Sequence, residues 1–347
     1  MSEAFLTQLL QAIPLASLLI GRGERILAAN DDAKALLGTA IVGRHYITAI
    51  RHPSVLDAVD GCLQDRKTRK ARHLTSEAGR DLTYRVTASY IDLGAGEGVL
   101  VSFEDTTHVE QAGQIRRDFV ANVSHELRTP LTALLGFIET LRGPAKNDPQ
   151  AQERFLTIMD REAHRMERLV RDLLSLSRVE SEERVRPTTR VDVASVVGSV
   201  ARTLAPLAEE AGVQIDPTGE TEGVLIPGDE DQLRQVFTNL IENGVKYGGS
   251  GGRVQVDVTV SDNVPSLRGA GVTITVRDSG PGIAEQHIPR LTERFYRVDS
   301  HRSREMGGTG LGLAIVKHII TRHRGRMRIE SRLGEGTAFI VILPLGQ

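Results

Sequence analysis

A stretch in the first half of the chain places one histidine on a strongly patterned helix. His125 is followed directly by Glu126, and Thr129 and Pro130 lie one helical turn further along. Apolar residues recur every three or four positions around it, which is the period of a helix with one buried face. They are Val120, Val123, Leu127, Leu131, Leu134, Ile138 and Leu141. The histidine lies beside this apolar face and not in it, so the face needs a packing partner and the histidine is left accessible for chemistry.

A second amphipathic helix is predicted at residues 150–179, after a turn at residues 143–149 that contains a glycine and two prolines. The two helices form an antiparallel hairpin, which cannot bury two apolar faces by itself. A homodimeric four-helix bundle is the simplest solution, and the alternative is a hairpin packed on other domains of the same chain. Pro130 removes one helical hydrogen bond and predicts a local bend beside His125.

The composition limits the class of protein. A chain of 347 residues predicts two or three domains. A net charge of -2 gives no electrostatic reason to expect a nucleic acid or an anionic membrane as partner. No segment approaches the roughly 20 consecutive apolar residues that span a bilayer, and no basic leader precedes the first apolar run. The single cysteine, Cys62, excludes an intramolecular disulfide and fits a reducing compartment. We expect a cytoplasmic chain, and the sequence leaves open the alternative of a longer form that is anchored in a membrane.

Residues 1–105 predict a small α+β domain with an antiparallel sheet. Strands are expected at 15–20, 25–30, 81–91 and 98–104. Asn30 is expected to cap one helix, and Ser54 another that follows Pro53. The step at residues 28–33 (AANDDA) and the closing residues 103–107 (FEDTT) resemble a PAS sensor domain. The alternative is a structural or dimerising domain without a ligand. His45, His52 and His73 are too scattered to predict a metal site.

Residues 188–347 alternate between strands and helices after a polar linker. Strands are predicted at 189–193, 213–216, 224–227, 254–260, 272–278, 327–331 and 337–343, and helices at 194–211, 230–247 and 311–323. This order predicts a mixed sheet covered on one face by helices, an α/β sandwich. The glycine run at 248–252 has no Lys-Ser/Thr and no helix after it, so we interpret it as a flexible connector and not as a phosphate loop.

Four blocks in this domain carry chemistry. Asn239 and Asn243 share a helix face with Lys246 close by; amide oxygens suit Mg²⁺ and a lysine suits a polyphosphate. Residues 278–283 (DSGPGI) place an aspartate at a strand end, where it can accept a hydrogen bond from an exocyclic amine while glycines permit close approach. Residues 293–299 set aromatic side chains between arginines, and residues 307–312 (GGTGLG) open a helix whose N–H groups suit phosphate. Taken alone, the first two blocks also fit a wet helix face and an ordinary turn.

Together and in this order, the four blocks resemble the ATP-binding fold of bacterial histidine kinases, gyrase-type topoisomerases and Hsp90-type chaperones. The resemblance implies ATP and Mg²⁺ as ligands, with Asn243 as the metal ligand and residues 283–306 as a mobile lid. It assigns nucleotide binding to Asn239, Asn243, Lys246, Tyr247, Asp278, Gly280, Gly282, Ile283, Phe295, Arg297, Gly308, Thr309, Gly310, Leu311 and Gly312.

Residues 124–130 (SHELRTP) resemble the phosphoacceptor box of the sensor histidine kinases of two-component systems. The likeness extends over the whole chain: a sensor domain (1–105), a dimerising and phosphotransfer hairpin (106–182) and an ATP-binding domain (188–347). Within that family the chain is most similar to the phosphate-regulon sensor kinases, which usually carry transmembrane helices that are not seen here. The resemblance implies autophosphorylation on His125 with Glu126 as general base. It places Arg128 and Thr129 in the same catalytic box.

The resemblance further implies a partner, because no receiver domain is present: the phosphoryl group would pass to an aspartate of a separate response regulator. The hydroxyl of Thr129 would position water for dephosphorylating that regulator; the alternative is an ordinary threonine before a proline. Two other classes of protein fit parts of this sequence. An ATP-driven clamp is disfavoured because hydrolases of this superfamily carry Glu at the position of Asn239, and a scaffold without kinase activity is disfavoured because all four nucleotide blocks are intact.

Overall fold

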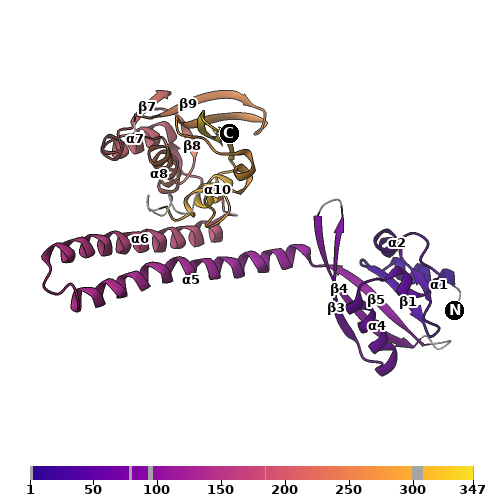
Figure 1. The fold of residues 1–347 in the computed structure, drawn as a ribbon. Coiled ribbons are helices and arrows are strands. Elements are labelled where there is room, and N and C mark those ends of the chain that lie inside the picture. Colours follow the sequence, from indigo (N-terminus) through magenta and orange to yellow (C-terminus); the bar gives the residue numbers. More distant parts are fainter. Residues whose placement is uncertain are drawn as a thin grey trace. The chain divides into compact units, whose positions relative to one another are not determined.

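The computed structural model describes residues 3–77, 80–92, 97–183, 185–249, 251–298 and 308–346. The chain forms two compact units, residues 1–121 and 122–347 (Figure 1). The boundary between them falls inside one long helix, α5 (Thr107–Arg142), which ends at the residue that the sequence predicted.

The first unit is built on a five-stranded antiparallel sheet with the strand order β2-β1-β5-β4-β3. The strands are β1 (Ala16–Gly21), β2 (Ile26–Ala29), β3 (Arg69–Glu77), β4 (Arg80–Asp92) and β5 (Glu97–Asp105). Its helices, apart from the start of α5, are α1 (Glu3–Gln11), α2 (Asp31–Leu37), α3 (Tyr46–Ala49) and α4 (Pro53–Asp65). This agrees with the predicted α+β class.

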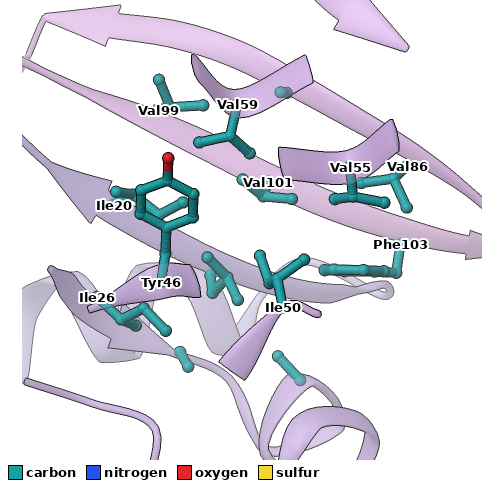
Figure 2. Packing of buried hydrophobic residues seen from close by; sticks show 14 of the residues in the cluster. Ile20, Ile26, Tyr46, Ile50, Val55, Val59, Val86, Val99, Val101 and Phe103 are labelled. Atoms are coloured by element: carbon teal, nitrogen blue, oxygen red, sulfur yellow. The ribbon is translucent and has the colours of Figure 1, made fainter. Parts of the chain in front are cut away.

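Both faces of this sheet are covered by apolar side chains. Neighbouring residues of β1 point to opposite sides of the sheet, so they enter two different cores. Leu18 and Ile20 enter the larger core together with residues of α3, α4, β4 and β5, including Tyr46 and Phe103 (Figure 2). Leu19, between them, enters a smaller core beneath α1. Cys62 lies in the larger core.

Two local predictions have different outcomes. The prediction for Asn30 is confirmed: its side chain accepts a hydrogen bond from Ala33 N at 3.0 Å and caps α2. The prediction that Ser54 caps the next helix is wrong. Helix α4 begins at Pro53, with His52 in the capping position, because a proline at the first helical position loses no intrahelical hydrogen bond. The hydroxyl of Ser54 instead donates to Arg72 O at 2.9 Å.

Strand β3 was not predicted from the sequence. It is an edge strand, and its residues (RKARHLTSE) are mostly charged or polar. Charged side chains are a common way to keep an exposed sheet edge from pairing with another chain. The pattern that marks a buried strand is therefore absent here.

The second unit contains the rest of α5 and helix α6 (Pro149–Glu182). The two helices are joined by the ion pair between Glu126 and Arg165, at 2.9 Å, and by the rings of Phe137 and Phe155, whose centroids are 5.4 Å apart. Apolar side chains of this hairpin remain exposed in the single chain: Leu131 (49%), Leu135 (55%), Leu156 (51%) and Leu174 (67%).

The remainder of the second unit is a helix-covered sheet with the strand order β11-β12-β10-β9-β7. Strands β7 and β9 are parallel and the other pairs are antiparallel, so the sheet is mixed as predicted. The strands are β7 (Gln214–Gly219), β9 (Arg253–Val264), β10 (Gly269–Asp278), β11 (Arg326–Arg332) and β12 (Gly336–Pro344). The helices are α7 (Val193–Glu210), α8 (Glu230–Tyr247), α10 (Gly312–Arg322) and the 3-10 helix η1 (Glu285–Arg290). The first half of β9 alternates between exposed and buried residues, as expected for a sheet with helices on one face.

One part of the predicted sheet is corrected. The two short strands β6 (Arg190–Asp192) and β8 (Leu225–Pro227) do not join the main sheet but pair with each other. Their connection is fixed by Asp192, whose carboxylate accepts hydrogen bonds from Gly223 N at 2.7 Å and from Val224 N at 3.2 Å. The pair ties the start of this domain to the strand before α8. Within the described ranges, no helix combines the length and the apolar character that crossing a membrane requires.

Candidate nucleotide and phosphotransfer site

Helix α8 has a buried side and a half-buried polar side. Val236, Phe237, Leu240, Ile241 and Val245 are buried in the core. The polar side carries four of the predicted nucleotide-binding residues, all of them half-buried: Asn239, Asn243, Lys246 and Tyr247. Their amide oxygens and ammonium group fit a divalent cation with a polyphosphate. Among the charged neighbours, Glu242 lies 3.3 Å from the Lys246 ammonium.

Asp278 lies at the end of β10, and only 6% of it is exposed. Its Oδ1 accepts hydrogen bonds from Gly280 N at 2.9 Å and from Thr337 N at 3.3 Å. Burial raises the pKa of this carboxyl above its usual value, and the two backbone N–H groups act in the opposite direction. The aspartate is therefore fixed in orientation at a position where burial disfavours its charge.

The glycines after Asp278 are required by close backbone contacts. A Cβ at Gly280 would lie 2.3 Å from the carbonyl oxygen of Tyr247, so this glycine lets the loop touch the end of α8. Gly282 has a φ of 71° and faces the carbonyl of Arg332. Ile283 N donates to Ser331 Oγ at 2.8 Å. These contacts place the Asp278 loop between α8 and the β11–β12 turn.

The glycine-rich run is joined to both other blocks. Gly310 has a φ of 75°, and its carbonyl accepts a hydrogen bond from Phe295 N at 2.9 Å. Gly312 opens α10 beside Asn239, whose Nδ2 donates to the Gly312 carbonyl at 3.4 Å. Leu311 is buried just before it, and Gly308 is half-buried. The N-terminal end of α10 is thus placed against the polar side of α8, which brings the predicted nucleotide blocks together.

His125 is exposed on α5, and its neighbour Glu126 is half-buried. Glu126 Oε2 forms ion pairs with two arginines. Arg165 of α6 lies at 2.9 Å, and Arg297, from the segment after η1, lies at 3.3 Å. Thr129 donates its hydroxyl to the His125 carbonyl at 3.2 Å. Arg128 is exposed. The residue after the histidine is therefore in direct contact with the nucleotide-binding half of the same unit.

A second contact of this kind lies close by. Thr309 of the glycine-rich run donates its hydroxyl to Asp172 Oδ2 of α6 at 2.7 Å, and its oxygen accepts from Leu311 N at 3.2 Å. Burial is the largest influence on Asp172 and raises the pKa of its carboxyl. The hydrogen bond from Thr309 lowers that pKa, and the charges of Glu242 and Lys246 on α8 also act on it.

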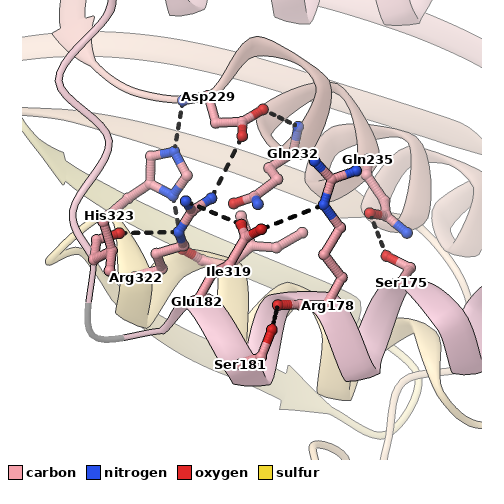
Figure 3. Close-up of polar contacts among 11 residues, drawn as sticks. Ser175, Arg178, Ser181, Glu182, Asp229, Gln232, Gln235, Ile319, Arg322 and His323 are labelled. Carbon is pink, nitrogen blue, oxygen red and sulfur yellow. Dashed lines mark hydrogen bonds and ion pairs between the residues drawn. The ribbon is translucent and has the colours of Figure 1, made fainter.

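A third group of contacts fixes the end of α6 (Figure 3). Arg322, at the end of α10, is 8% exposed and binds Glu182 at 3.1 Å and Asp229 at 3.4 Å. Its Nε donates to Val185 O at 3.0 Å. His323 accepts a hydrogen bond from Asp229 N through Nε2 at 3.0 Å. Its Nδ1 lies 2.8 Å from the carbonyl of Ile319, so this nitrogen carries the ring proton.

Further polar contacts join the same end of α6, and the residue that follows it, to the nucleotide-binding half. His318 of α10 lies 2.7 Å from Glu183 and 3.5 Å from Glu180. Arg294 binds Glu180 at 2.5 Å. Acidic side chains of α6 thus face basic side chains of the other half at several points.

Sequence reasoning missed the residues that make these connections, namely Arg165, Asp172, Glu182 and Arg322. The acidic run at the end of α6 was interpreted as part of a polar linker, and nothing in its local pattern indicates a partner on α10. Part of the predicted lid, residues 299–306, lies outside the described residues. The described part of the predicted lid contains η1. There His287 Nδ1 is hydrogen-bonded to the Tyr296 hydroxyl at 2.6 Å.

The architecture and these residues define a class of protein. An exposed histidine on a helical hairpin is joined to an α/β sandwich with an amide, aspartate and glycine-rich site. Residues 115–182 match the family described as the His Kinase A (phospho-acceptor) domain. Residues 228–347 match the histidine kinase-, DNA gyrase B- and HSP90-like ATPase family. The chain belongs to the sensor histidine kinases, the protein-histidine kinases of two-component signalling.

Two relatives illustrate this membership. The phosphate regulon sensor protein PhoR of Pseudomonas aeruginosa is 39% identical over 313 residues, which is 89% of this chain and 67% of the relative. The sensor protein kinase WalK of Staphylococcus aureus is 35% identical over 328 residues, 93% of this chain and 76% of the relative. The chain spans about half (52%) of the length of another WalK, from Staphylococcus saprophyticus.

A solved structure has the same fold over the full length. It is the histidine kinase ThkA in complex with the response regulator protein TrrA, with a TM-score of 0.53 and 21% identity. The match covers 100% of this chain and 99% of that chain.

Proposed function

We propose that this chain phosphorylates itself on His125 with ATP and then transfers the phosphoryl group to an aspartate of a separate response regulator. The observation that carries the proposal is the direct contact between the two halves of the second unit. Glu126, next to His125, is bound by Arg297, and Thr309 of the glycine-rich run is bound by α6. The acceptor histidine and the nucleotide site therefore belong to one compact unit.

The nucleotide would be held between α8 and the start of α10. Asp278 would accept from the adenine amino group, flanked by Tyr247, Gly280, Gly282 and Ile283. The phosphates would meet Lys246, Arg297 and the N–H groups of residues 308–312, with Phe295 beside Gly310. Asn243, with Asn239 next to it, would hold Mg²⁺, which when bound neutralises charge on the phosphates.

His125 would act as a neutral nucleophile. One imidazole nitrogen forms a bond to the γ-phosphorus, the bond from that phosphorus to the bridging oxygen breaks, and ADP leaves with the electron pair. Glu126 accepts the proton of the other imidazole nitrogen. Asn239 cannot deprotonate water as a carboxylate can, which favours transfer to His125 over hydrolysis.

The experiment is incubation of the purified chain with labelled ATP, followed by measurement of acid-labile protein-bound phosphate. His125→Gln should abolish the labelling while ATP still binds, because only the acceptor atom is removed. His164→Gln, an exposed histidine of α6, is the matched control. Undiminished acid-labile labelling of His125→Gln would overturn the assignment.

We further infer that the same helix turn dephosphorylates the regulator, with Thr129 positioning the attacking water. Thr129 is exposed on α5, one turn after His125, and its hydroxyl oxygen can still accept while it donates to the His125 carbonyl. Thr129→Ala should lose regulator dephosphorylation and keep autophosphorylation. Equal dephosphorylation rates for Thr129→Ala and the parent would refute this role.

Two further features belong to the proposal. The exposed apolar residues of the hairpin support a homodimer joined through a four-helix bundle, because isolated apolar faces of this size are covered in stable proteins.

The similarity to a phosphate regulon sensor protein supports a role of residues 1–105, as a PAS-like sensor domain, in the response to phosphate starvation. The hairpin (106–182) and the ATP-binding domain (188–347) would form the catalytic part.

A further inference from the structure

One carboxylate of the phosphotransfer hairpin reaches the nucleotide half at its phosphate end. Asp172 Oδ2 lies 2.7 Å from the hydroxyl oxygen of Thr309, and Thr309 is 9% exposed. The charges of Lys246 and Glu242 act on the same carboxylate from α8. Three different elements, namely α6, α8 and the glycine-rich run, therefore converge around Asp172.

In the proposed function, Lys246 and the backbone N–H groups of residues 308–312 would hold the phosphates, and the Thr309 hydroxyl belongs to the same glycine-rich run. A hydroxyl group has one proton to donate, and in this structure Thr309 donates it to Asp172. A phosphate oxygen could receive the same proton only if the carboxylate gave it up. The phosphate and the carboxylate are both anionic, so their mutual repulsion adds to this competition.

We propose that Asp172 is a positioning residue whose negative charge, held at Thr309 by the hydrogen bond, lowers the affinity of the site for nucleotide phosphates. The inference rests on the proposed function and adds a residue of α6 to the control of nucleotide affinity. Because coupling between two binding events is reciprocal, bound phosphates would in turn weaken the contact between α6 and the glycine-rich run. ATP binding would thereby loosen the contact that Asp172 makes in this structure.

The competing explanation is that Asp172 only packs and caps the run at Thr309. The two explanations differ in what a neutral substitute should do. Asp172→Asn keeps the shape and an amide oxygen that can accept from Thr309, but it removes the charge. A purely structural residue would leave affinity unchanged or weaken it for every ligand, whereas a competitor of phosphates would affect only ligands that carry phosphates.

The test measures dissociation constants of the full 347-residue chain for adenosine, ADP and the non-hydrolysable analogue AMP-PNP by calorimetry. Asp172→Asn should bind AMP-PNP about 5- to 50-fold more tightly, within the range typical of coupled sites. The gain for ADP should be smaller, and adenosine should bind as it does to the parent. Asp172→Glu, which keeps the negative charge, should bind AMP-PNP with an affinity close to that of the parent. The matched control is Asp160→Asn, an exposed aspartate on the same helix.

Parent-like AMP-PNP affinity in Asp172→Asn would overturn the inference, and so would an equal change for adenosine. If Asp172→Asn does not fold, Asp172→Ser provides the same removal of charge, and the same comparison of ligands decides. Failure of the parent and of all variants to bind any of the three ligands would instead overturn the proposed function together with this inference. Tight binding by the parent with no response at position 172 would overturn the inference alone.

Discussion

Arg297 and Glu126 form an ion pair, with 3.3 Å between the guanidinium Nη2 and the carboxylate Oε2. It joins the segment after η1 to the residue that follows His125. Arg165 contacts the same oxygen from α6 at 2.9 Å. Both guanidinium groups contact the same oxygen of the carboxylate, so its second oxygen, Oε1, is the one at which it can accept a proton from the histidine.

The first prediction concerns Glu126 as the proton acceptor. Glu126→Gln should lower the rate of autophosphorylation by about 10²- to 10⁴-fold, the range expected for loss of a general base. Nucleotide affinity is measured in parallel, because Glu126 pairs with Arg297, which would meet the phosphates; at saturating ATP a change in affinity does not alter the labelling rate. Single-turnover labelling at saturating ATP measures the rate, and Glu139→Gln, at an exposed position of α5, is the control. Parent-like labelling of Glu126→Gln would show that the proton leaves by another route.

The second prediction concerns the buried carboxyl of Asp278. Burial raises its pKa above the usual value of 3.8, so at neutral pH the folded protein carries a charge that its surroundings disfavour. Asp278→Asn should abolish nucleotide binding and raise stability by about 1 kcal/mol at pH 7, which corresponds to about 2–4 °C in melting temperature for a unit of this size.

The pH dependence of this effect has a defined sign. A raised pKa in the folded state contributes stability that is fully present below pH 3.8 and is lost as the pH rises past the raised pKa. The advantage of Asp278→Asn should therefore be full at pH 7 and shrink toward acid. Melting curves of both proteins between pH 4.5 and pH 8 measure it. A lower melting temperature of Asp278→Asn at pH 7 would contradict the prediction.

Much of the fold follows from the sequence because long helices and buried strands have strong periodicity. Helix α8 was predicted at residues 230–247 and is found there. The end of α5 at Arg142 was also predicted, because glycine and proline follow it. Polar edge strands such as β3 carry no such pattern. The short pair β6 and β8 was assigned to the wrong sheet, since pairing between distant strands is not encoded in either strand alone.

The candidate site divides in the same way. Its glycines and Asp278 could be named in advance, because their motif is local and the backbone contacts that require Gly280 and Gly282 follow the strand directly. Asp172 could not be predicted. Its only sign in the sequence is one acidic residue on an amphipathic helix, and its significance comes from Thr309, which lies 137 residues away. Contacts between domains depend on tertiary docking, which periodicity does not report.

The third prediction concerns Arg322, which binds Glu182, Asp229 and the Val185 carbonyl. Arg322→Met should destabilise the second unit by roughly 3 kcal/mol, because two carboxylates lose a buried cationic partner. Differential scanning calorimetry measures the shift. Arg326→Met, at an exposed position at the start of β11, is the control and should change stability by less than about 0.5 kcal/mol. An equal effect of both substitutions would show that the network of Arg322 adds nothing specific.

The fourth prediction concerns His323, which is 1% exposed and neutral, because burial lowers its pKa below the usual 6.5. His323→Leu leaves the Asp229 N–H without its acceptor and should reduce stability by about 1–3 kcal/mol at pH 7.5. A lowered pKa gives stability that is present above pH 6.5 and is lost as the pH falls toward the folded-state value. The difference between the parent and His323→Leu should therefore shrink between pH 7.5 and pH 5.5. Chemical denaturation at several pH values measures it, with His164→Leu, at an exposed site on α6, as the control. A difference that stays constant across this range would show that His323 does not couple protonation to folding.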